Sequence, residues 1–147
     1  MNVLFGTDVI IDIVERREPF YDASNRAANH AIDGEVTGFV SVQSLKDVFC
    51  FVRKVKGEKR AFDIVERLSA IFMPLGVHSE DSLTALMSGS RDYKDALLNA
   101  SAVRNGIDMI LMRDREGFIE SDLLIVPPEE LDRYLESGVN SGGAVIG

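Results

Sequence analysis

The sequence predicts an α/β fold, a three-layer α/β/α sandwich with a central, mainly parallel sheet. Short apolar runs of strand length alternate with longer segments in which apolar residues recur at helical spacing. This alternation is typical of βαβ units, in which helices cover both faces of parallel strands. With 147 residues, the chain is long enough for one domain with a substantial core. We expect that domain over residues 1–137, followed by a flexible glycine-rich tail over 138–147.

Apolar runs of strand length identify the predicted sheet. Each is rich in Val, Ile, Leu, Phe or Met and is bounded by glycine, proline or polar residues, as buried strands are. In chain order the predicted strands are Asn2–Phe5, Glu35–Val42, Phe72–Val77, Met109–Met112 and Leu123–Val126.

Helical spacing and capping residues identify the segments between these strands. Ser41 is a suitable N-cap for a helix with apolar residues at i, i+3, i+4 and i+7. Ser79 opens another helix that has two acids in its first turn, and Gly106 is placed to end a third. The predicted helices cover Asp22–Ile32, the segment after Ser41, Glu58–Ile71, the segment from Ser79, Asp92–Asn105 and a short helix opened by Pro127-Pro128 that runs through Leu135.

Composition limits the classes of function. The formal net charge of −8 opposes simple electrostatic adhesion to nucleic acid or to an anionic membrane. Basic residues between Arg53 and Arg67 admit two readings, a solvated helix face or a rim that follows phosphates. No apolar run is long enough for a membrane span, so we expect a cytoplasmic protein without membrane contact. Cys50 is the only cysteine and is interpreted as a small buried hydrophobe.

Aspartates follow or precede several predicted strands. Asp8 comes after the first strand and Asp114 after the fourth, while Asp92 and Asp95 share a face of the helix between them. Because sites in such folds lie beyond the carboxyl ends of the strands, we expect these acids to face one cleft together with Asp47. Carboxylate oxygens are the ligands that hard divalent cations prefer. Acids that cluster also repel each other, and a bound cation relieves that repulsion.

Four short motifs in order resemble a known family. They are Val3-Leu4-Phe5-Gly6-Thr7-Asp8 with the following apolar helix start, Ser44-Leu45-Lys46-Asp47, Asp92-Tyr93-Lys94-Asp95-Ala96-Leu97 and Met112-Arg113-Asp114. Arg17-Glu18-Pro19-Phe20 and Phe118 continue the pattern, which covers about residues 2 to 135. Together these segments resemble the PIN domain, the ribonuclease fold of many toxins in toxin–antitoxin pairs.

The resemblance implies metal-assisted hydrolysis of phosphodiester bonds in single-stranded or structured RNA. It implies catalytic roles for Asp47, Asp95 and Asp114. It also implies that Mg²⁺ or Mn²⁺ is held by Asp8, Asp47, Asp92, Asp95 and Asp114. For Asp92 a helix N-cap is the competing role. An antitoxin protein and a second copy of the chain are the implied partners.

Two residues depart from the family pattern. Gly6 stands where the family has its first metal-binding aspartate, and Met112 stands where it has a threonine hydroxyl. Three explanations are open for Gly6. Asp8 shifts into the vacant volume, or the other acids and water hold a weakly bound ion, or the site has lost catalysis.

Three functions therefore compete. The first is a metal-dependent ribonuclease with weakened catalysis, and the second is an inactive PIN domain that binds RNA or protein as a regulatory module. The third, an aspartyl phosphatase, has the least support because Gly6-Thr7-Asp8 supplies only one of the two acids it needs. We interpret Asp12, one helical turn beyond Asp8, as a cap or surface charge, and His30 and His78 as surface or structural residues.

Overall fold

All five predicted strands are present and form one sheet. The computed structural model describes residues 1–115, 121 and 123–136. Within these residues every strand pairing is parallel, in the order β3-β2-β1-β4-β5. Phe118 and the predicted tail over 138–147 lie outside the described residues. β1 has the predicted bounds, and the other strands are shorter than the apolar runs that predict them: β1 (Asn2–Phe5), β2 (Thr37–Ser41), β3 (Met73–Leu75), β4 (Met109–Leu111) and β5 (Leu124–Val126).

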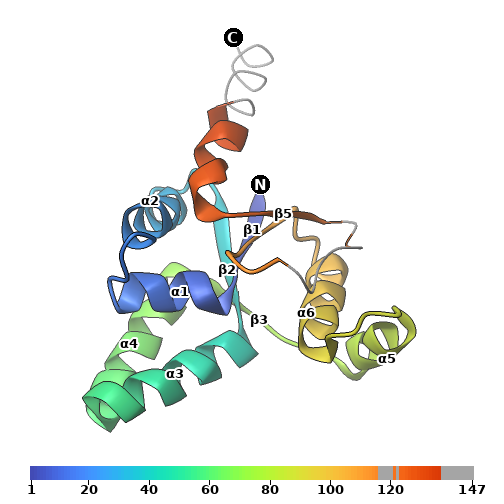
Figure 1. Ribbon diagram of the computed structural model, residues 1–147, viewed down its shortest axis with the longest axis horizontal. Coiled ribbons are helices and arrows are strands. Elements are labelled where there is room, and N and C mark those ends of the chain that lie inside the picture. Colours follow the sequence, from blue (N-terminus) through green and yellow to red (C-terminus); the bar gives the residue numbers. More distant parts are fainter. Residues whose placement is uncertain (116–120, 122, 137–147) are drawn as a thin grey trace.

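Helices connect the strands and agree with the predicted segments to within one or two residues. A helical segment over 131–136 follows the last strand and a short 3₁₀ turn. Figure 1 shows how the helices are divided between the two sides of the sheet. Their bounds are α1 (Thr7–Val14), α2 (Tyr21–Ile32), α3 (Val42–Lys56), α4 (Glu58–Ile71), α5 (Ser79–Met87), α6 (Tyr93–Arg104) and η2 (Pro128–Glu130).

The helix ends predicted at Ser41 and Gly106 form as expected, and α5 begins with a capping box at His78 that was not predicted. The Ser41 hydroxyl accepts a hydrogen bond from the Ser44 amide at 3.0 Å and begins α3. Asp81 accepts from the His78 amide at 2.8 Å and completes a capping box at the start of α5. Gly106 follows α6 with φ of +69°, a conformation that glycine adopts without strain.

The sheet packs against helices on both faces, but unequally. Helices α1 to α4 cover one face, and α5 and α6 lie on the other (Figure 1). The larger core places Val3 and Phe5 of β1 against Val48 of α3 and Leu68 of α4. The smaller core places Leu4, from the opposite side of the same strand, near Ala102 of α6. This confirms the predicted three-layer α/β/α sandwich.

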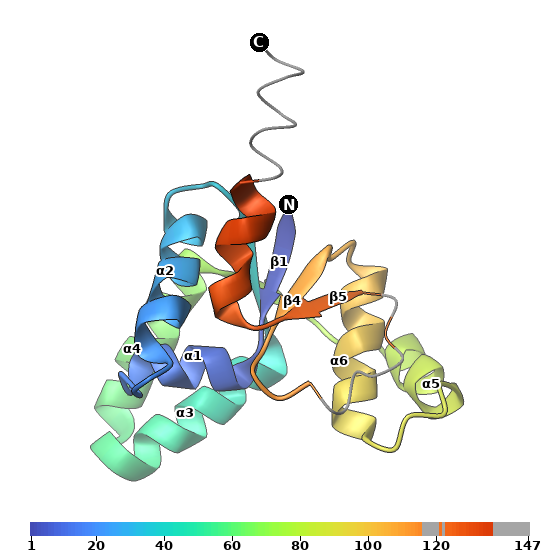
Figure 2. The same cartoon turned by 45° about the horizontal axis from the view of Figure 1, so that its top comes forward.

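Parallel strands bring several chain segments to one edge of the sheet. Figure 2 shows β1 running away from the N-terminus and ending beside the start of α1 and the start of α3. The sequence leaves β1 through Gly6 and β2 through Ser41, which are the N-caps of α1 and α3. The connection that leaves β4 begins at Met112. This edge therefore gathers the segments that carry the predicted site residues.

Two predictions about single residues are wrong. Asp12 is fully buried and not a surface charge, because it pairs with Arg113 across the chain. Cys50 is exposed and not buried, since the inward stripe of α3 is formed by Leu45, Val48 and Val52 instead. In both cases helical spacing alone places the residue near the boundary of the apolar face, and the tertiary contacts decide its burial.

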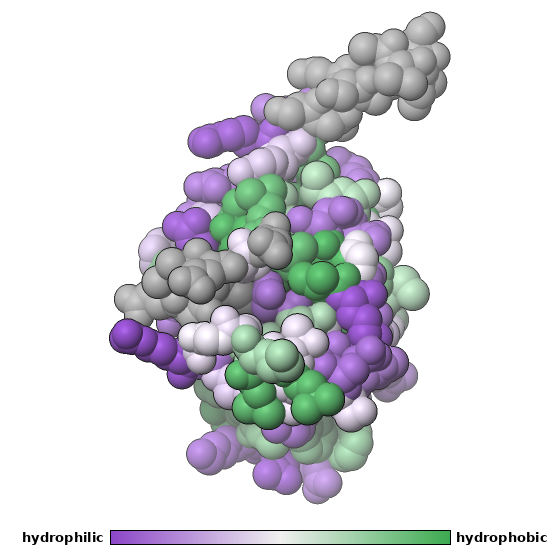
Figure 3. Space-filling view, turned by 90° about the vertical axis from the view of Figure 1, so that its right-hand side faces the viewer, coloured by the Kyte–Doolittle hydropathy of each residue, from purple (hydrophilic) through white to green (hydrophobic). Residues whose placement is uncertain are grey.

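The outer surface of α5 carries large apolar side chains. Leu83, Leu86 and Met87 are 64%, 69% and 86% exposed. Figure 3 looks at the side of the molecule where α5 lies and shows hydrophobic side chains in groups among hydrophilic ones. Among the described residues, no helix has the length and apolar character needed to cross a membrane.

Candidate active site

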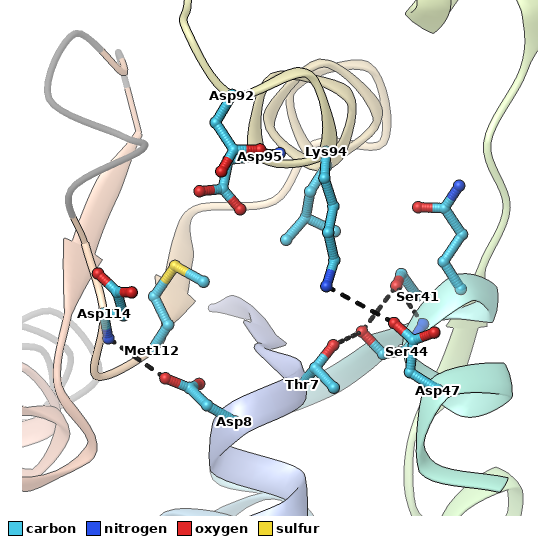
Figure 4. A pocket seen from close by; sticks show the side chains of 12 residues that line it. Thr7, Asp8, Ser41, Ser44, Asp47, Asp92, Lys94, Asp95, Met112 and Asp114 are labelled. Carbon is cyan, nitrogen blue, oxygen red and sulfur yellow. Dashed lines mark hydrogen bonds and ion pairs between the residues drawn. The ribbon is translucent and has the colours of Figure 1, made fainter. Parts of the chain in front are cut away.

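One pocket lies at the carboxyl edge of the sheet, and all five predicted site acids line it. They reach it from four separate parts of the chain: the start of α1, the first half of α3, the start of α6 and the connection after β4 (Figure 4). The complete lining consists of Thr7, Asp8, Ser41, Gln43, Ser44, Asp47, Asp92, Lys94, Asp95, Leu98, Met112 and Asp114.

Asp8 binds backbone amides on both sides of this pocket. Its Oδ1 atom accepts a hydrogen bond from the Val9 amide at 2.7 Å. Its Oδ2 atom accepts from the amides of Arg113 at 2.9 Å and Asp114 at 3.2 Å. Asp8 therefore fixes the connection after β4 against the start of α1, and its lone pairs are partly used by backbone groups.

The wall formed by α3 combines hydroxyl groups with a carboxylate. The Ser44 hydroxyl lies 2.7 Å from that of Thr7 and accepts a hydrogen bond from Ser41 at 2.9 Å. Asp47, one turn further along α3, is half-buried and forms ion pairs with Lys46 at 3.5 Å and Lys94 at 3.7 Å. This chain of hydroxyl groups was not predicted from the sequence. Its signal was the spacing of Ser41 and Ser44, at the N-cap and the third residue of one helix.

Asp92 and Asp95 form the opposite wall, at the start of α6. The Asp92 carboxylate accepts a hydrogen bond from the Asp95 amide at 3.1 Å, which confirms the N-cap role. Partial burial, with repulsion from Asp92 and Asp114, raises the pKa of Asp95 to about 6, and the Lys94 ammonium opposes that rise. Negative charge is therefore concentrated around Asp95.

Gly6 is closed in by β4, and a side chain there would require its neighbours to shift. A Cβ atom there would lie 2.9 Å from the Leu111 carbonyl oxygen and 3.0 Å from the Met112 Cβ. It would also lie 3.2 Å from Oδ1 of Asp8, so the Asp8 carboxylate does reach the volume beside Gly6. The backbone of Gly6, with φ of −67° and ψ of 159°, suits any residue. An added side chain at this position is therefore opposed by close contacts and not by the backbone conformation.

A buried ion pair holds the loop that carries Asp114. Arg113 donates to Asp12 from Nε at 2.6 Å and from Nη2 at 3.2 Å, and its guanidinium stacks 3.9 Å from the centre of the Phe20 ring. The pairing of Asp12 with Arg113 was not predicted from the sequence. An acid inside the apolar run Val9–Val14 was the available signal, because a buried carboxylate needs a partner.

The donor chemistry of the pocket fits a hard divalent cation, with a weaker set of ligands than the resemblance implies. Carboxylates face it from three walls. Among the described residues, however, no three His, Cys, Asp or Glu side chains are grouped closely enough to hold a metal ion. Asp8 is engaged by amides and Asp47 by lysines. Asp95, with Asp92 and Asp114 facing it, is the best remaining ligand, and water would complete the coordination.

The sequence matches one known protein family over most of its length. The model of the PIN domain matches residues 2–116, most of the chain. The chain belongs to the PIN-domain family. The four motifs that suggested this PIN domain all lie within the matched residues. No curated protein matches the sequence.

Solved structures share the fold of this PIN domain. One is a toxin–antitoxin complex from Klebsiella pneumoniae, with 18% identity, TM-score 0.62 and coverage of 86% of this chain and 97% of that one. VapBC-1 from nontypeable Haemophilus influenzae has 11% identity and TM-score 0.64, with 87% and 98% covered. VapC20 of Mycobacterium tuberculosis, described as a Sarcin-Ricin loop cleaving toxin, has 14% identity and TM-score 0.60, with 78% and 91% covered. Identities this low show the fold alone.

Proposed function

We propose that this PIN domain is a metal-dependent ribonuclease of the toxin–antitoxin type whose catalysis is weakened at Gly6. One observation carries the proposal: five aspartates from four separate segments line a single pocket at the carboxyl edge of the sheet. Family membership supports the reaction class. The RNA-cleaving role further draws on the likeness to VapC20, described as a Sarcin-Ricin loop cleaving toxin.

In this proposal Asp47, Asp95 and Asp114 are the catalytic residues, and Mg²⁺ or Mn²⁺ is held by Asp95 together with Asp47, Asp92 or Asp114. Such an ion, when bound, polarises the scissile phosphate and lowers the pKa of an attacking water. Without a bound ion, partial burial and the neighbouring acids raise the pKa of Asp95 to about 6, so a cation that binds there would displace a proton as the pH falls towards that value. Asp8 positions the Asp114 backbone through its hydrogen bonds to the amides of Arg113 and Asp114.

The linked hydroxyl groups of Thr7 and Ser44 share one hydrogen bond and keep one O–H donor between them for a phosphate oxygen of an RNA strand in the pocket. They are 2.7 Å apart and both line it, so a phosphate that reaches Asp47 passes beside them. The surrounding acids repel an anionic substrate, and a neutral hydroxyl donor adds nothing to that repulsion. Substrate binding therefore depends on neutralisation of the acids as well as on these hydroxyls.

The proposal includes an antitoxin partner and a homodimer in the cytoplasm. Support for the antitoxin comes from the similar solved structures, among them a toxin–antitoxin complex. The exposed apolar side chains of α5 support a protein partner more generally, since a large exposed apolar patch is unusual on a monomer.

A second candidate is a catalytically inactive PIN domain that binds RNA or protein. The absence of a carboxylate at Gly6 favours it, because the site then lacks the ligand that the family resemblance implies at the end of the first strand. The two candidates predict different results in one cleavage assay.

The test is single-turnover cleavage of a labelled RNA by excess protein, with Mn²⁺ or with EDTA. We expect slow cleavage that EDTA abolishes and that Asp95→Asn reduces by about 100-fold, the order found when a group that stabilises transition-state charge is lost. Asp22→Asn, which removes an exposed acid of α2 far from the pocket lining, is the matched control and should cleave as the native chain does. Cleavage that survives both EDTA and Asp95→Asn contradicts the site. No cleavage with Mn²⁺ favours the second candidate.

A further inference from the structure

Lys94 reaches across the pocket between its two acidic walls. It is the second residue of α6, between Asp92 and Asp95 in sequence, and its side chain extends towards α3 (Figure 4). Its ammonium lies 3.7 Å from Oδ2 of Asp47. Among the described residues that line the pocket, Lys94 is the only one with a positive charge.

The position of this ammonium is that of a counter-ion. It pairs with Asp47 on one wall and acts on Asp95 on the other, where it opposes the repulsion from Asp92 and Asp114. Aspartates facing one pocket attract any cation that reaches them. Lys94 is part of α6, the helix that carries Asp95. Its ammonium is therefore present at the pocket acids at a high effective concentration.

The closed wall at Gly6 increases the weight of this counter-ion. Because residue 6 is a glycine, the end of the first strand supplies no carboxylate, and a Cβ there would meet the backbone of β4 at 2.9 Å. Asp8, the nearest acid, accepts hydrogen bonds from three backbone amides. A divalent cation must therefore bind through Asp47, Asp95 and their neighbours, which are the acids that Lys94 faces.

We propose that Lys94 is a resident cation that competes with the divalent metal ion for the pocket and sets its metal affinity. The inference rests on the proposed metal-dependent site. To bind the ion, the Lys94 side chain must leave Asp47 and turn towards solvent. It has the freedom to do so, because 69% of the side chain is exposed. The cost of binding is the lost ion pair together with repulsion between ammonium and metal ion.

The experiment is calorimetric titration of Mn²⁺ into the metal-free full-length protein. Lys94→Met removes the charge and keeps an unbranched side chain of similar length. Removing one positive charge about 5 Å from a divalent ion should tighten Mn²⁺ binding by about tenfold. Lys94→Arg keeps the charge, so we expect its Kd to stay within about threefold of the native value.

Lys46→Met is the matched control. Lys46 also pairs with Asp47, at 3.5 Å, and its side chain is 70% exposed, yet it does not line the pocket. We expect Lys46→Met to change the Kd of Mn²⁺ by less than about threefold, because Lys46 lies outside the pocket lining and its charge does not act on Asp95 as that of Lys94 does. Circular dichroism should show that all three variants fold, since both lysines are exposed.

Equal tightening by Lys94→Met and Lys46→Met would overturn the inference, because it would show only a loss of general charge. No tightening by Lys94→Met, or no Mn²⁺ binding by any chain, would overturn it as well. A Lys94→Met protein with native Mn²⁺ affinity and weakened RNA binding in EDTA would instead make Lys94 a substrate-binding residue. RNA cleavage is a separate readout. If no chain cleaves but Mn²⁺ affinity shifts as expected, the proposed nuclease function fails while the competition by Lys94 stands.

Discussion

Two groups of aspartates in this protein occupy opposite electrostatic environments. Asp12 and Asp81 are almost completely buried, and each accepts two hydrogen bonds from one arginine, Arg113 and Arg104 respectively. Hydrogen bonds from Arg104 hold the pKa of Asp81 below its usual range. Asp95 lies in an open pocket beside other acids, and its pKa is raised to about 6.

The difference separates acids that hold the fold from acids placed for a ligand. A buried carboxylate is tolerated only with a partner of opposite charge, so Asp12 and Asp81 join segments far apart in sequence. Asp12 joins α1 to the loop after β4, and Asp81 joins α5 to α6. The pocket acids face one another with less compensation, which makes the site receptive to cations at a small cost in stability.

The largest test of this comparison is removal of the charge from each group. Asp12→Asn should lower the free energy of unfolding by about 3 kcal/mol, because it breaks a buried pair and leaves Arg113 without its counter-ion. Asp95→Asn should raise the free energy of unfolding slightly at pH 7. A folded-state pKa above the ordinary 3.8 means that the ionised form of Asp95 is disfavoured in the fold.

Urea denaturation at pH 7 measures both variants. An equal loss of stability in Asp95→Asn and Asp12→Asn would contradict the distinction between fold-holding acids and pocket acids. That distinction is sharpened if the same Asp95→Asn protein is both more stable and less active, since that combination identifies a site maintained at the expense of the fold.

A smaller effect concerns the closed wall of the pocket. Gly6→Ala should lower the free energy of unfolding by about 1–3 kcal/mol, because the new Cβ meets the Leu111 carbonyl at 2.9 Å and overpacks the contact between β1 and β4. For the same reason we expect Gly6→Asp to destabilise the domain.

Gly76→Ala is the matched control for this position. A Cβ on Gly76 meets no atom within 4 Å, so we expect a change within about 0.5 kcal/mol. Urea denaturation of the two alanine variants measures the difference. Equal stability of the two would show that β1 and β4 separate easily at Gly6, and that the missing carboxylate can be replaced there.

The smallest effect concerns the ion pairs of His30. The burial of this side chain lies between that of Asp12 and Asp81 and that of the pocket acids. Its Nε2 lies 2.5 Å from Asp132 and its Nδ1 3.2 Å from Glu35, which ties α2 to the helical segment over 131–136. Burial of the ring disfavours the charged form, but the hydrogen bonds to Asp132 and Glu35 outweigh it and raise the pKa of His30 above 6.5.

A raised pKa means that the folded state binds the proton more tightly than the unfolded state. The stabilisation from His30 is therefore complete below pH 6.5 and is lost as pH rises through its raised pKa. Thermal unfolding followed from about pH 5 to about pH 9 should show a decline in the native protein that is reduced in His30→Gln. Parallel curves for the two proteins would exclude this contribution.

Local patterns predicted the elements of this fold well. Ser41 caps α3, as its position before the apolar helical stripe predicts, and Gly106 follows the end of α6. The fates of single residues at the margin of an apolar face were not predictable in this way. Asp12 is buried and Cys50 is exposed, the reverse of what was expected. The burial of Asp12 depends on Arg113 and that of Cys50 on the packing of α3, and local spacing predicts neither.

The candidate site divides in the same way. Its five acids could be chosen from sequence, because strand ends and helix starts of parallel βαβ units converge at one edge. Lys94, the Ser41–Ser44–Thr7 hydroxyl chain and the Asp12–Arg113 pair could not. Their roles are set by distances between α1, α3, α6 and the loop after β4.

The sequence by itself determined the family, the order of strands and helices, and the residues that meet at the pocket, since periodicity and short motifs are local properties of a chain. Only the tertiary structure decided what those residues do to one another. It shows that Gly6 is closed in by β4, that Asp8 is engaged by backbone amides and that Lys94 crosses to Asp47. Space and charge at the pocket depend on the packing of segments about 40 to 100 residues apart, and no local pattern records that packing.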